Sequence, residues 1–237
     1  MEELPHFVGK VYSANLTHSS VYGVLKMYSD AELAYLLKTG ISREGKFVPW
    51  MIRPNLADDD INDILIYLRS NDEPLAAADT TAGKTKVKWF AKVGMRLTMH
   101  PFKYEYTKKP SEADASNYGK YLVDNLACYH CHSSRVEGLN YLHPEKSSGY
   151  MQGGMEFDIR KKLIYSANLT PDSLSGIGRY NLPQFIKTLR SGIKLNGEKF
   201  KKPMQTFPHL TDEQIRAIYI YLKLLPPKQH FVKISDQ

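Results

Sequence analysis

One stretch of this chain occurs twice, and the repetition limits the folds that the chain can adopt. Three segments recur in the same order: residues 11–20 (VYSANLTHSS) as 164–173 (IYSANLTPDS), 36–51 (LLKTGISREGKFVPWM) as 188–204 (TLRSGIKLNGEKFKKPM), and 56–70 (LADDDINDILIYLRS) as 210–224 (LTDEQIRAIYIYLKL). Self-similarity on this scale predicts two copies of one structural unit.

Each copy carries helix signals. Ser29 with Glu32, and Thr211 with Gln214, have the spacing of capping boxes. Apolar residues then follow at helical spacing, namely Ile61, Ile64, Leu65 and Leu68 in the first copy and Ile215, Ile218, Tyr219 and Leu222 in the second. The last helix of each copy should end near Ser70 and before Pro226. No alternating apolar pattern competes, so we expect an all-α fold with long loops.

The two cysteines of the chain lie together. Cys128 and Cys131 are separated by two residues, and His132 follows at once, giving CYHCH. This C-x-x-C-H pattern is typical of covalent haem c attachment. Each thiol can bond one vinyl group of the porphyrin, and the imidazole can then bind the iron as an axial ligand. The sequence predicts one covalently bound haem c per chain.

Three other sites use the same residue types. A zinc site needs four ligands, and no second cysteine pair exists, although His130, His132 and His143 could contribute. A thiol–disulfide redox couple is expected beside a βαβ unit, which the helical pattern does not favour. A disulfide across two intervening residues would remove little chain entropy. Haem attachment is therefore favoured.

A sixth ligand for an electron-transfer haem is commonly a methionine sulfur. Met204 follows a proline in KKPMQTF, and its counterpart in the first copy, Met51, lies next to a proline-containing stretch in FVPWM. Methionines beside a core are often fillers, but this position is shared by both copies. We take Met204 as the candidate, with Met151 and Met155 in reserve.

The formal charge of +7 is concentrated in one segment. Between residues 79 and 109 eight basic residues face two acidic ones. Such a surface suits an acidic redox partner or the membrane surface, and the alternative is a solvated connector. We expect no nucleic-acid partner. The apolar residues of the same segment (Trp89, Phe90, Met95, Leu97, Met99 and Phe102) are expected to pack on one or both domains.

The repeated SANLT motif also matches the N-glycosylation pattern at Asn15 and Asn168. Because the motif recurs at matching positions of the two copies, we expect a turn or packing role instead.

Five segments carry a resemblance to a known family: YGKYLVDNLACYHCH, GGMEF, YSANLTPDSLSGIGRY, FIKTLRSGI and KKPMQTFPHLTDEQIRAIYIYLKLLPP. They resemble the C-terminal domain of bacterial two-domain, dihaem cytochromes c, over residues 117–227, and residues 11–70 resemble it more loosely. The resemblance implies tandem class I cytochrome c-like domains. It also implies Cys128 and Cys131 as attachment sites.

Further roles follow from the same resemblance. It implies His132 and Met204 as axial ligands and Arg179 and Tyr180 as contacts of a haem propionate. It also implies that a helix at about 116–126 crosses the helix after Thr211, with Gly119 and Tyr221 as candidates for the crossing point.

The first copy departs from this family, since the stretch with the first helix and the C-x-x-C-H motif has no counterpart before residue 11. We expect residues 1–72 to form an incomplete cytochrome c-like domain, 73–116 a basic, aromatic connecting segment, and 117–237 a cytochrome c domain with one haem. An upstream segment that this sequence lacks would explain both this gap and the absence of an export signal.

These expectations describe an electron carrier and not an enzyme. The resemblance implies a subunit or partner of a periplasmic or membrane-bound dehydrogenase, passing electrons to a respiratory acceptor. It places the chain in the periplasm or on the periplasmic face of the inner membrane. The alternative is a haem enzyme or sensor whose iron keeps an open position for peroxide or a gas.

Overall fold

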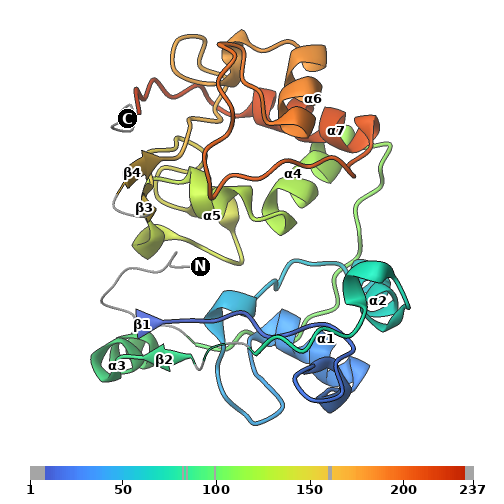
Figure 1. Cartoon of the computed structure of the whole chain (residues 1–237). Helices are drawn as coiled ribbons and strands as arrows, with labels where there is room; N and C mark the ends of the chain where they lie inside the picture. Colours follow the sequence, from blue (N-terminus) through green and yellow to red (C-terminus); the bar gives the residue numbers. More distant parts are fainter. Residues whose placement is uncertain (1–8, 82, 84, 99, 160–161, 233–237) are drawn as a thin grey trace. The chain divides into compact units, whose positions relative to one another are not determined.

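The structure is a computed structural model that describes residues 9–81, 83, 85–98, 100–159 and 162–232. The N-terminal residues 1–8, Lys84 and Met99, on which sequence-based expectations fell, lie outside that part. The chain divides into two compact units, residues 1–109 and 110–237, labelled by their helices and strands in Figure 1. Each unit is described by itself.

Helices dominate both units, which confirms the expected class. Unit 1 contains β1 (Gly9–Lys10), η1 (Leu25–Met27), α1 (Asp30–Thr39), η2 (Pro49–Met51), α2 (Asp58–Arg69), η3 (Glu73–Leu75), β2 (Lys86–Val87) and α3 (Trp89–Thr98). Unit 2 contains α4 (Ala115–Asn125), α5 (Cys128–His132), η4 (Val136–Gly138), η5 (Pro144–Lys146), β3 (Glu156–Ile159), β4 (Lys162–Tyr165), η6 (Ile177–Arg179), α6 (Leu182–Ser191) and α7 (Asp212–Leu224).

Two short antiparallel ladders supplement the helices. β1 pairs with β2 at Gly9 and Val87, and β3 pairs with β4 from Glu156 opposite Tyr165 to Ile159 opposite Lys162. The sequence analysis predicted neither pair of strands. In the described part of the chain, no helix is long and apolar enough to cross a membrane.

The predicted helix starts are confirmed. Ser29 caps α1 and Thr211 caps α7 through complete capping boxes, in which each hydroxyl accepts the N–H of the third helical residue. Asn181 and Gln184 form a third box at the start of α6. The predicted ends also hold, because α2 stops at Arg69 and α7 stops at Leu224.

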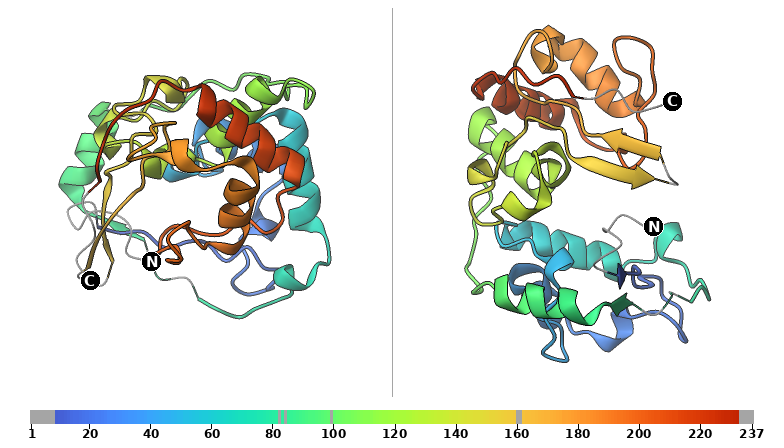
Figure 2. Two further views of the ribbon diagram at one scale, coloured as in Figure 1. Left: turned by 90° about the horizontal axis from the view of Figure 1, so that it is seen from above. Right: turned by 90° about the vertical axis from the view of Figure 1, so that its left-hand side faces the viewer.

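The core of unit 2 is built where α4 crosses α7, and Figure 2 shows the two helices against each other in both views. Gly119 lies at the crossing point. A Cβ atom there would lie 2.0 Å from the Ala217 carbonyl oxygen and 2.9 Å from Cβ of Tyr221. The expected crossing at Gly119 and Tyr221 is therefore confirmed, because only a residue without a side chain permits this approach.

The corresponding face of α2 in unit 1 is open. Ile64 and Tyr67 are 38% and 44% exposed, whereas their counterparts in the repeat, Ile218 and Tyr221, are 3% and 8% exposed. The opposite side of α2 is buried through Ile61 and Leu65. The same sequence pattern therefore forms a covered helix in unit 2 and a helix with one uncovered apolar face among the described residues of unit 1.

The connecting segment is held to unit 1 by a buried lysine. Lys38 is fully buried, and its Nζ donates to Thr107 Oγ1 at 2.8 Å and to the Glu105 carbonyl at 3.0 Å. The same ammonium lies 3.3 Å from the Asp58 carboxylate. Burial lowers the pKa of Lys38, while the negative charge of Asp58 opposes that shift. The donors and acceptors around Lys38 offset the cost of burying its charge.

The aromatic residues of the connecting segment do not all pack as expected. Trp89 and Leu97 are 76% and 73% exposed, and Phe90 is exposed as well, so the expectation of packing is wrong for all three. The reason is that α3 turns the small side chain of Ala91, which is half-buried, towards the unit. Phe102 is half-buried and donates its N–H to the Thr39 carbonyl. The side chains of Met95 and Met99 lie outside the described part.

Replacing Gly119 by alanine tests the crossing of α4 and α7. The added methyl group must displace the Ala217 carbonyl, so we expect Gly119→Ala to lower the free energy of unfolding of unit 2 by about 1–3 kcal/mol. Denaturant unfolding followed by circular dichroism measures the change. Gly94→Ala in α3 is the control, because a Cβ there meets nothing within 4 Å. Equal stability of the two variants would contradict the proposed packing.

The open face of α2 has a consequence for local stability. Fewer apolar contacts should let α1 and α2 open more often than α4 and α7. We expect the amides of residues 31–38 and 61–68 to exchange with solvent faster than the amides within α7, measured by hydrogen–deuterium exchange on the intact chain. Strong protection across both stretches, equal to that of α7, would show that unit 1 is as stable as unit 2.

Candidate functional site

The predicted attachment motif forms the short helix α5. Ala127, in the left-handed region at φ 60°, separates α4 from α5 and turns the chain between them. Within α5, Cys128 and Cys131 lie one turn apart and therefore on one side of the helix. Neither thiol is part of a disulfide, and both cysteines are half-buried. Burial, reinforced by the neighbouring Cys131 and Asp124, raises the pKa of Cys128 to about 12, so this thiol stays protonated.

His132 ends α5 and is buried. Its Nδ1 lies 2.7 Å from the Ala167 carbonyl oxygen, and because a carbonyl only accepts, Nδ1 carries the proton. Burial lowers the pKa of His132 and favours the neutral ring. The remaining nitrogen, Nε2, then has its lone pair available. This is the form in which histidine binds a metal ion, and the hydrogen bond to the Ala167 carbonyl fixes the orientation of the ring.

A second contact fixes the backbone of His132. Its carbonyl oxygen accepts the N–H of Gly153 at 2.8 Å. Gly153 has φ 70°, and a Cβ there would lie 2.4 Å from the Ala167 carbonyl group. The loop around Gly153 and the segment that follows β4 at Ala167 are therefore in close contact, and both contact His132.

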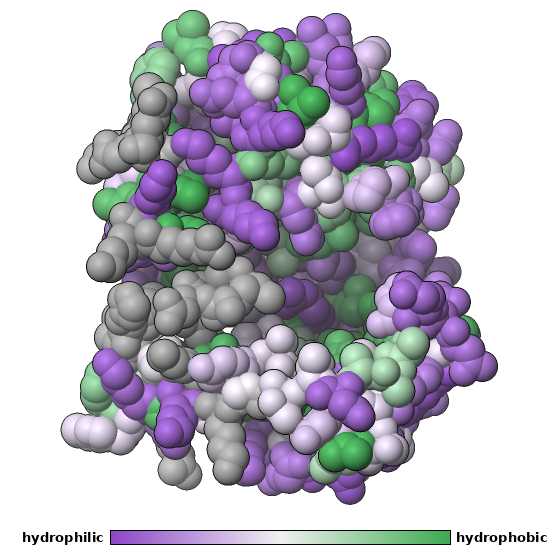
Figure 3. All heavy atoms as spheres, in the orientation of Figure 1, coloured by the Kyte–Doolittle hydropathy of each residue, from purple (hydrophilic) through white to green (hydrophobic). Residues whose placement is uncertain are grey.

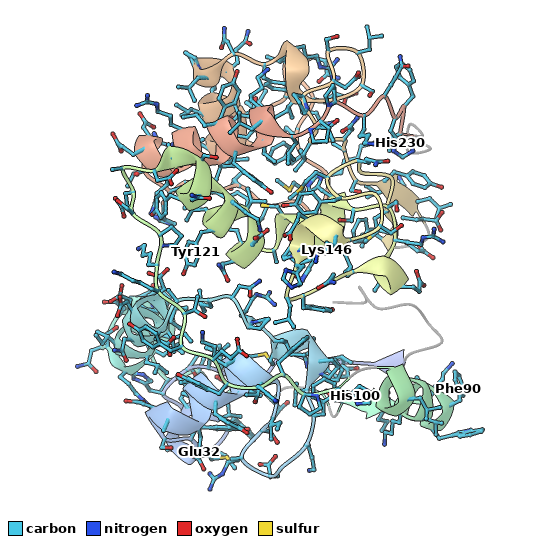
Figure 4. The ribbon with its side chains drawn as sticks, turned by 180° about the vertical axis from the view of Figure 1, so that it is seen from behind. Glu32, Phe90, His100, Tyr121, Lys146 and His230 are labelled. Carbon is cyan, nitrogen blue, oxygen red and sulfur yellow. The ribbon has the colours of Figure 1, made fainter. Side chains whose placement is uncertain are left out.

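The repeated SANLT motif fastens the C-terminal segment to this loop pair. The side-chain amide of Asn168 donates to the Lys228 carbonyl at 2.7 Å, and the Lys228 N–H donates to Thr170 Oγ1 at 3.1 Å. Nδ1 of His230, labelled in Figure 4, lies 3.0 Å from the Gln152 carbonyl. Asn168 is buried with its amide engaged, which confirms the packing role. In unit 1, Asn15 donates to the Ala78 carbonyl in the same way.

A buried polar network lies before the cysteines and was missed by the sequence analysis. The Asp124 carboxylate pairs with Lys120 at 2.6 Å and accepts from the Tyr150 hydroxyl at 3.3 Å. Tyr150 and Tyr221 share a hydrogen bond of 3.0 Å, and Lys120 also pairs with Glu145. Burial raises the pKa of Asp124, against the opposing effect of Lys120. The i, i+4 spacing of Lys120 and Asp124 was the available signal.

The other predicted site residues lie on separate loops. Met204 is half-buried, and its N–H donates to the Lys201 carbonyl. The reserve candidates Met151 and Met155 are both buried, with Met151 in the hydrophobic core. Arg179 is exposed, and the carbonyl of the half-buried Tyr180 accepts the Tyr219 hydroxyl at 2.8 Å. The arrangement of these residues around a haem stays a prediction.

The residues of α5 fit a covalently attached haem. They supply two thiols, neither of them in a disulfide, on one side of a helical turn and a neutral imidazole whose Nδ1 is already engaged. Beside them, the buried Ser133 hydroxyl has no partner among the described residues. A zinc site fits less well, since no group of three or more His, Cys, Asp or Glu residues in the described ranges is arranged to hold a metal ion.

Comparisons with known proteins agree with this chemistry. The chain is 27% identical over 239 residues to the fructose dehydrogenase cytochrome subunit of Gluconobacter japonicus, covering 93% of this chain and 46% of that protein. It is 30% identical over 145 residues to the cytochrome c subunit of a quinone alcohol dehydrogenase of Gluconobacter oxydans (60% and 28%). No family model matches the chain.

A third relative extends the pattern to another dehydrogenase. The chain is 31% identical over 105 residues to the gluconate 2-dehydrogenase cytochrome c subunit of Pantoea cypripedii, covering 44% of this chain and 21% of that protein. All three relatives are cytochrome c subunits of dehydrogenases, so the chain is homologous to cytochrome c subunits. It spans less than half the length of each of them.

The contacts of Asn168 lead to a test of the loop pair behind His132. Asn168→Ala removes the bond to the Lys228 carbonyl and leaves the buried Thr170 N–H without its acceptor, so we expect the free energy of unfolding of unit 2 to fall by about 1–3 kcal/mol. Hydrogen exchange at Gly153 and within α7 measures the loss. Asn15→Ala is the matched control and should affect unit 1 alone. Unchanged exchange at Gly153 in Asn168→Ala would show that the contacts of Asn168 do not support the loop around Gly153.

Proposed function

We propose that this chain is an electron-transfer cytochrome c subunit that carries one haem c in its second unit and works with a dehydrogenase. The observation that carries the proposal is α5, where two cysteines outside any disulfide are followed by a neutral histidine whose Nδ1 is hydrogen-bonded to the Ala167 carbonyl. The homology to cytochrome c subunits of fructose, alcohol and gluconate dehydrogenases supports it.

In this proposal the protein holds and shields a redox centre. A haem bound at this site would supply a reversible one-electron couple at its iron. Cys128 and Cys131 would anchor it by thioether bonds, and His132 would offer Nε2 while Ala167 fixes the ring plane. The engaged Nδ1 proton also makes the imidazole a stronger donor. None of these residues transfers a proton to or from a substrate, so the chain acts as a carrier.

Met204 is proposed as the second axial ligand. A thioether ligand raises the reduction potential because it favours ferrous iron. Charges near the haem would also affect the reduction potential. Asp124 lies four residues before Cys128 and is neutralised by Lys120. Pairing of this carboxylate keeps an uncompensated negative charge away from the attachment site. We propose Arg179 and Tyr180 as contacts of the propionates.

The donor would be a dehydrogenase subunit and the acceptor a respiratory protein. Haem c is attached outside the cytoplasm in the bacterial family that this chain resembles, so we propose the periplasm or the periplasmic face of the inner membrane. The basic segment 79–109 suits docking on an acidic redox partner or on the membrane surface. For residues 1–72 we propose a cytochrome c-like domain; the given residues contain no C-x-x-C-H motif.

Optical spectroscopy with intact-mass analysis tests the proposal. The chain is exported together with a cytochrome c maturation system, and we expect one covalent haem and a weak near-infrared band in the oxidised state. Met204→Ala should abolish that band, because the band arises from the iron–sulfur bond. Met151→Leu, which conserves volume at the buried reserve position, should keep it.

Other outcomes point to other functions. High-spin spectra that Met204→Ala leaves unchanged would indicate an open iron position and therefore a haem enzyme or sensor. A loss of the band in Met151→Leu alone would move the ligand to Met151. Absence of covalent haem, with metal retained by the protein, would contradict the haem proposal and return the zinc site to consideration.

A further inference from the structure

The helix α3 presents its large apolar side chains to solvent. Trp89, Val93 and Leu97 are spaced four residues apart and therefore lie on one face, and Phe90 lies beside them. All four are exposed, and among the side chains of α3 that the structure describes the half-buried one is the small Ala91. Figure 4 shows α3 at the margin of unit 1 with Phe90 directed outward. Helices that stabilise a core show the reverse arrangement.

Positive charge borders this apolar face. Lys86, Lys88 and Lys92 are all exposed, and Nζ of Lys88 lies 5.9 Å from the centre of the Phe90 ring. The sequence from residue 80 to residue 104 contains six basic residues and no acidic one. In Figure 3 hydrophobic and hydrophilic residues stand side by side along this edge of unit 1. Together with these three lysines, Trp89, Phe90, Val93 and Leu97 form the basic helix face.

We propose that the basic helix face docks on an anionic phospholipid surface. Its composition is that of a helix lying in a membrane interface, with tryptophan, phenylalanine and leucine on one side and lysine on the other. The indole ring of Trp89 suits the headgroup level, where aromatic residues with one polar atom gather. The lysine chains can extend along the helix and place their ammonium groups among lipid phosphates.

The kind of charge distinguishes a lipid surface from a protein surface. Protein interfaces are enriched in arginine and depleted in lysine. Of the four cations between residues 86 and 96 three are lysines and one is Arg96, and lysines bind a diffuse anionic surface without needing fixed partners. The contact area also differs, since one face of a ten-residue helix is small for a stable protein interface but sufficient for shallow insertion beside charged headgroups.

Vesicle flotation of the intact, haem-loaded chain tests the proposal. We expect the protein to float with vesicles of equimolar phosphatidylcholine and phosphatidylglycerol and to stay behind with phosphatidylcholine alone. In the Trp50→Phe background Trp89 is the remaining tryptophan, and its emission should shift to the blue on binding the anionic vesicles. Raised salt should weaken the binding, because the attraction is partly electrostatic.

Paired variants separate the two parts of the face. We expect Trp89→Ala with Leu97→Ala, and separately Lys88→Glu with Lys92→Glu, each to reduce vesicle binding at least tenfold. The matched control is Lys187→Glu with Lys199→Glu, which makes the same change of charge at exposed sites of unit 2 and should keep the binding. Optical spectra verify that all variants retain the haem site.

Three results would overturn the proposal. The first is that the unmodified chain does not bind the anionic vesicles. The second is that the control variant loses vesicle binding as much as the test variants do. The third is that Trp89 emission stays unshifted on bound vesicles. Sedimentation of the free protein adds a further arm: self-association that Trp89→Ala abolishes, without vesicle binding, would assign the basic helix face to a second copy of the chain. Because vesicle binding needs no electron transfer, its outcome is independent of the proposed function.

Discussion

The close approach of α4 and α7 at Gly119 is the constraint on which unit 2 depends. With the Ala217 carbonyl 2.0 Å from where a Cβ would lie, the two helix backbones are in direct contact, and Tyr221 packs beside them. This crossing fixes the C-terminal end of α4. Since Ala127 turns the chain immediately into α5, the crossing also determines where Cys128, Cys131 and His132 point. The position of one glycine therefore controls the geometry of the candidate redox site.

The internal repeat allows the same sequence pattern to be compared in two settings. Lys38 and Arg190 occupy matching positions, and each pairs with the first aspartate of the following helix, at 3.3 Å to Asp58 and 2.7 Å to Asp212. The arginine pair is exposed and contributes little. The lysine pair is buried because the connecting segment covers it, so a surface ion pair of one unit has become an internal anchor in the other.

Much of the fold could be predicted from local signals. Capping boxes at Ser29 and Thr211 were predicted correctly because their effects act over three or four residues. The crossing at Gly119 was predicted from the family resemblance and not from a local signal. The short antiparallel pair β3 and β4 was missed because the alternation of polar and apolar residues in β3 covers four residues only. The orientation of α3 could not be predicted either, since helical spacing shows that an apolar face exists but not which way the face points.

The candidate site divides in the same manner. The motif CYHCH identified Cys128, Cys131 and His132, whereas the groups that fix them come from distant segments: Ala167, Gly153 and Tyr150. Their roles depend on backbone carbonyls and buried side chains, which leave no spacing signature in one sequence. SANLT is the exception, because its recurrence signalled a structural role before Asn168 was seen to bind Lys228.

The C-terminal segment contacts both of the loops that hold His132. Asn168 follows Ala167, which holds the His132 ring, and Gln152 precedes Gly153, which holds the His132 backbone. Lys228 and His230 bind to Asn168 and Gln152, so one extended segment fastens both supports of the same histidine. In the proposed function, a histidine fixed on two sides would change position little between the oxidation states of a bound haem. The low reorganisation that rapid electron transfer requires would then come from hydrogen bonds to the backbone, with no charged residue needed at the histidine itself.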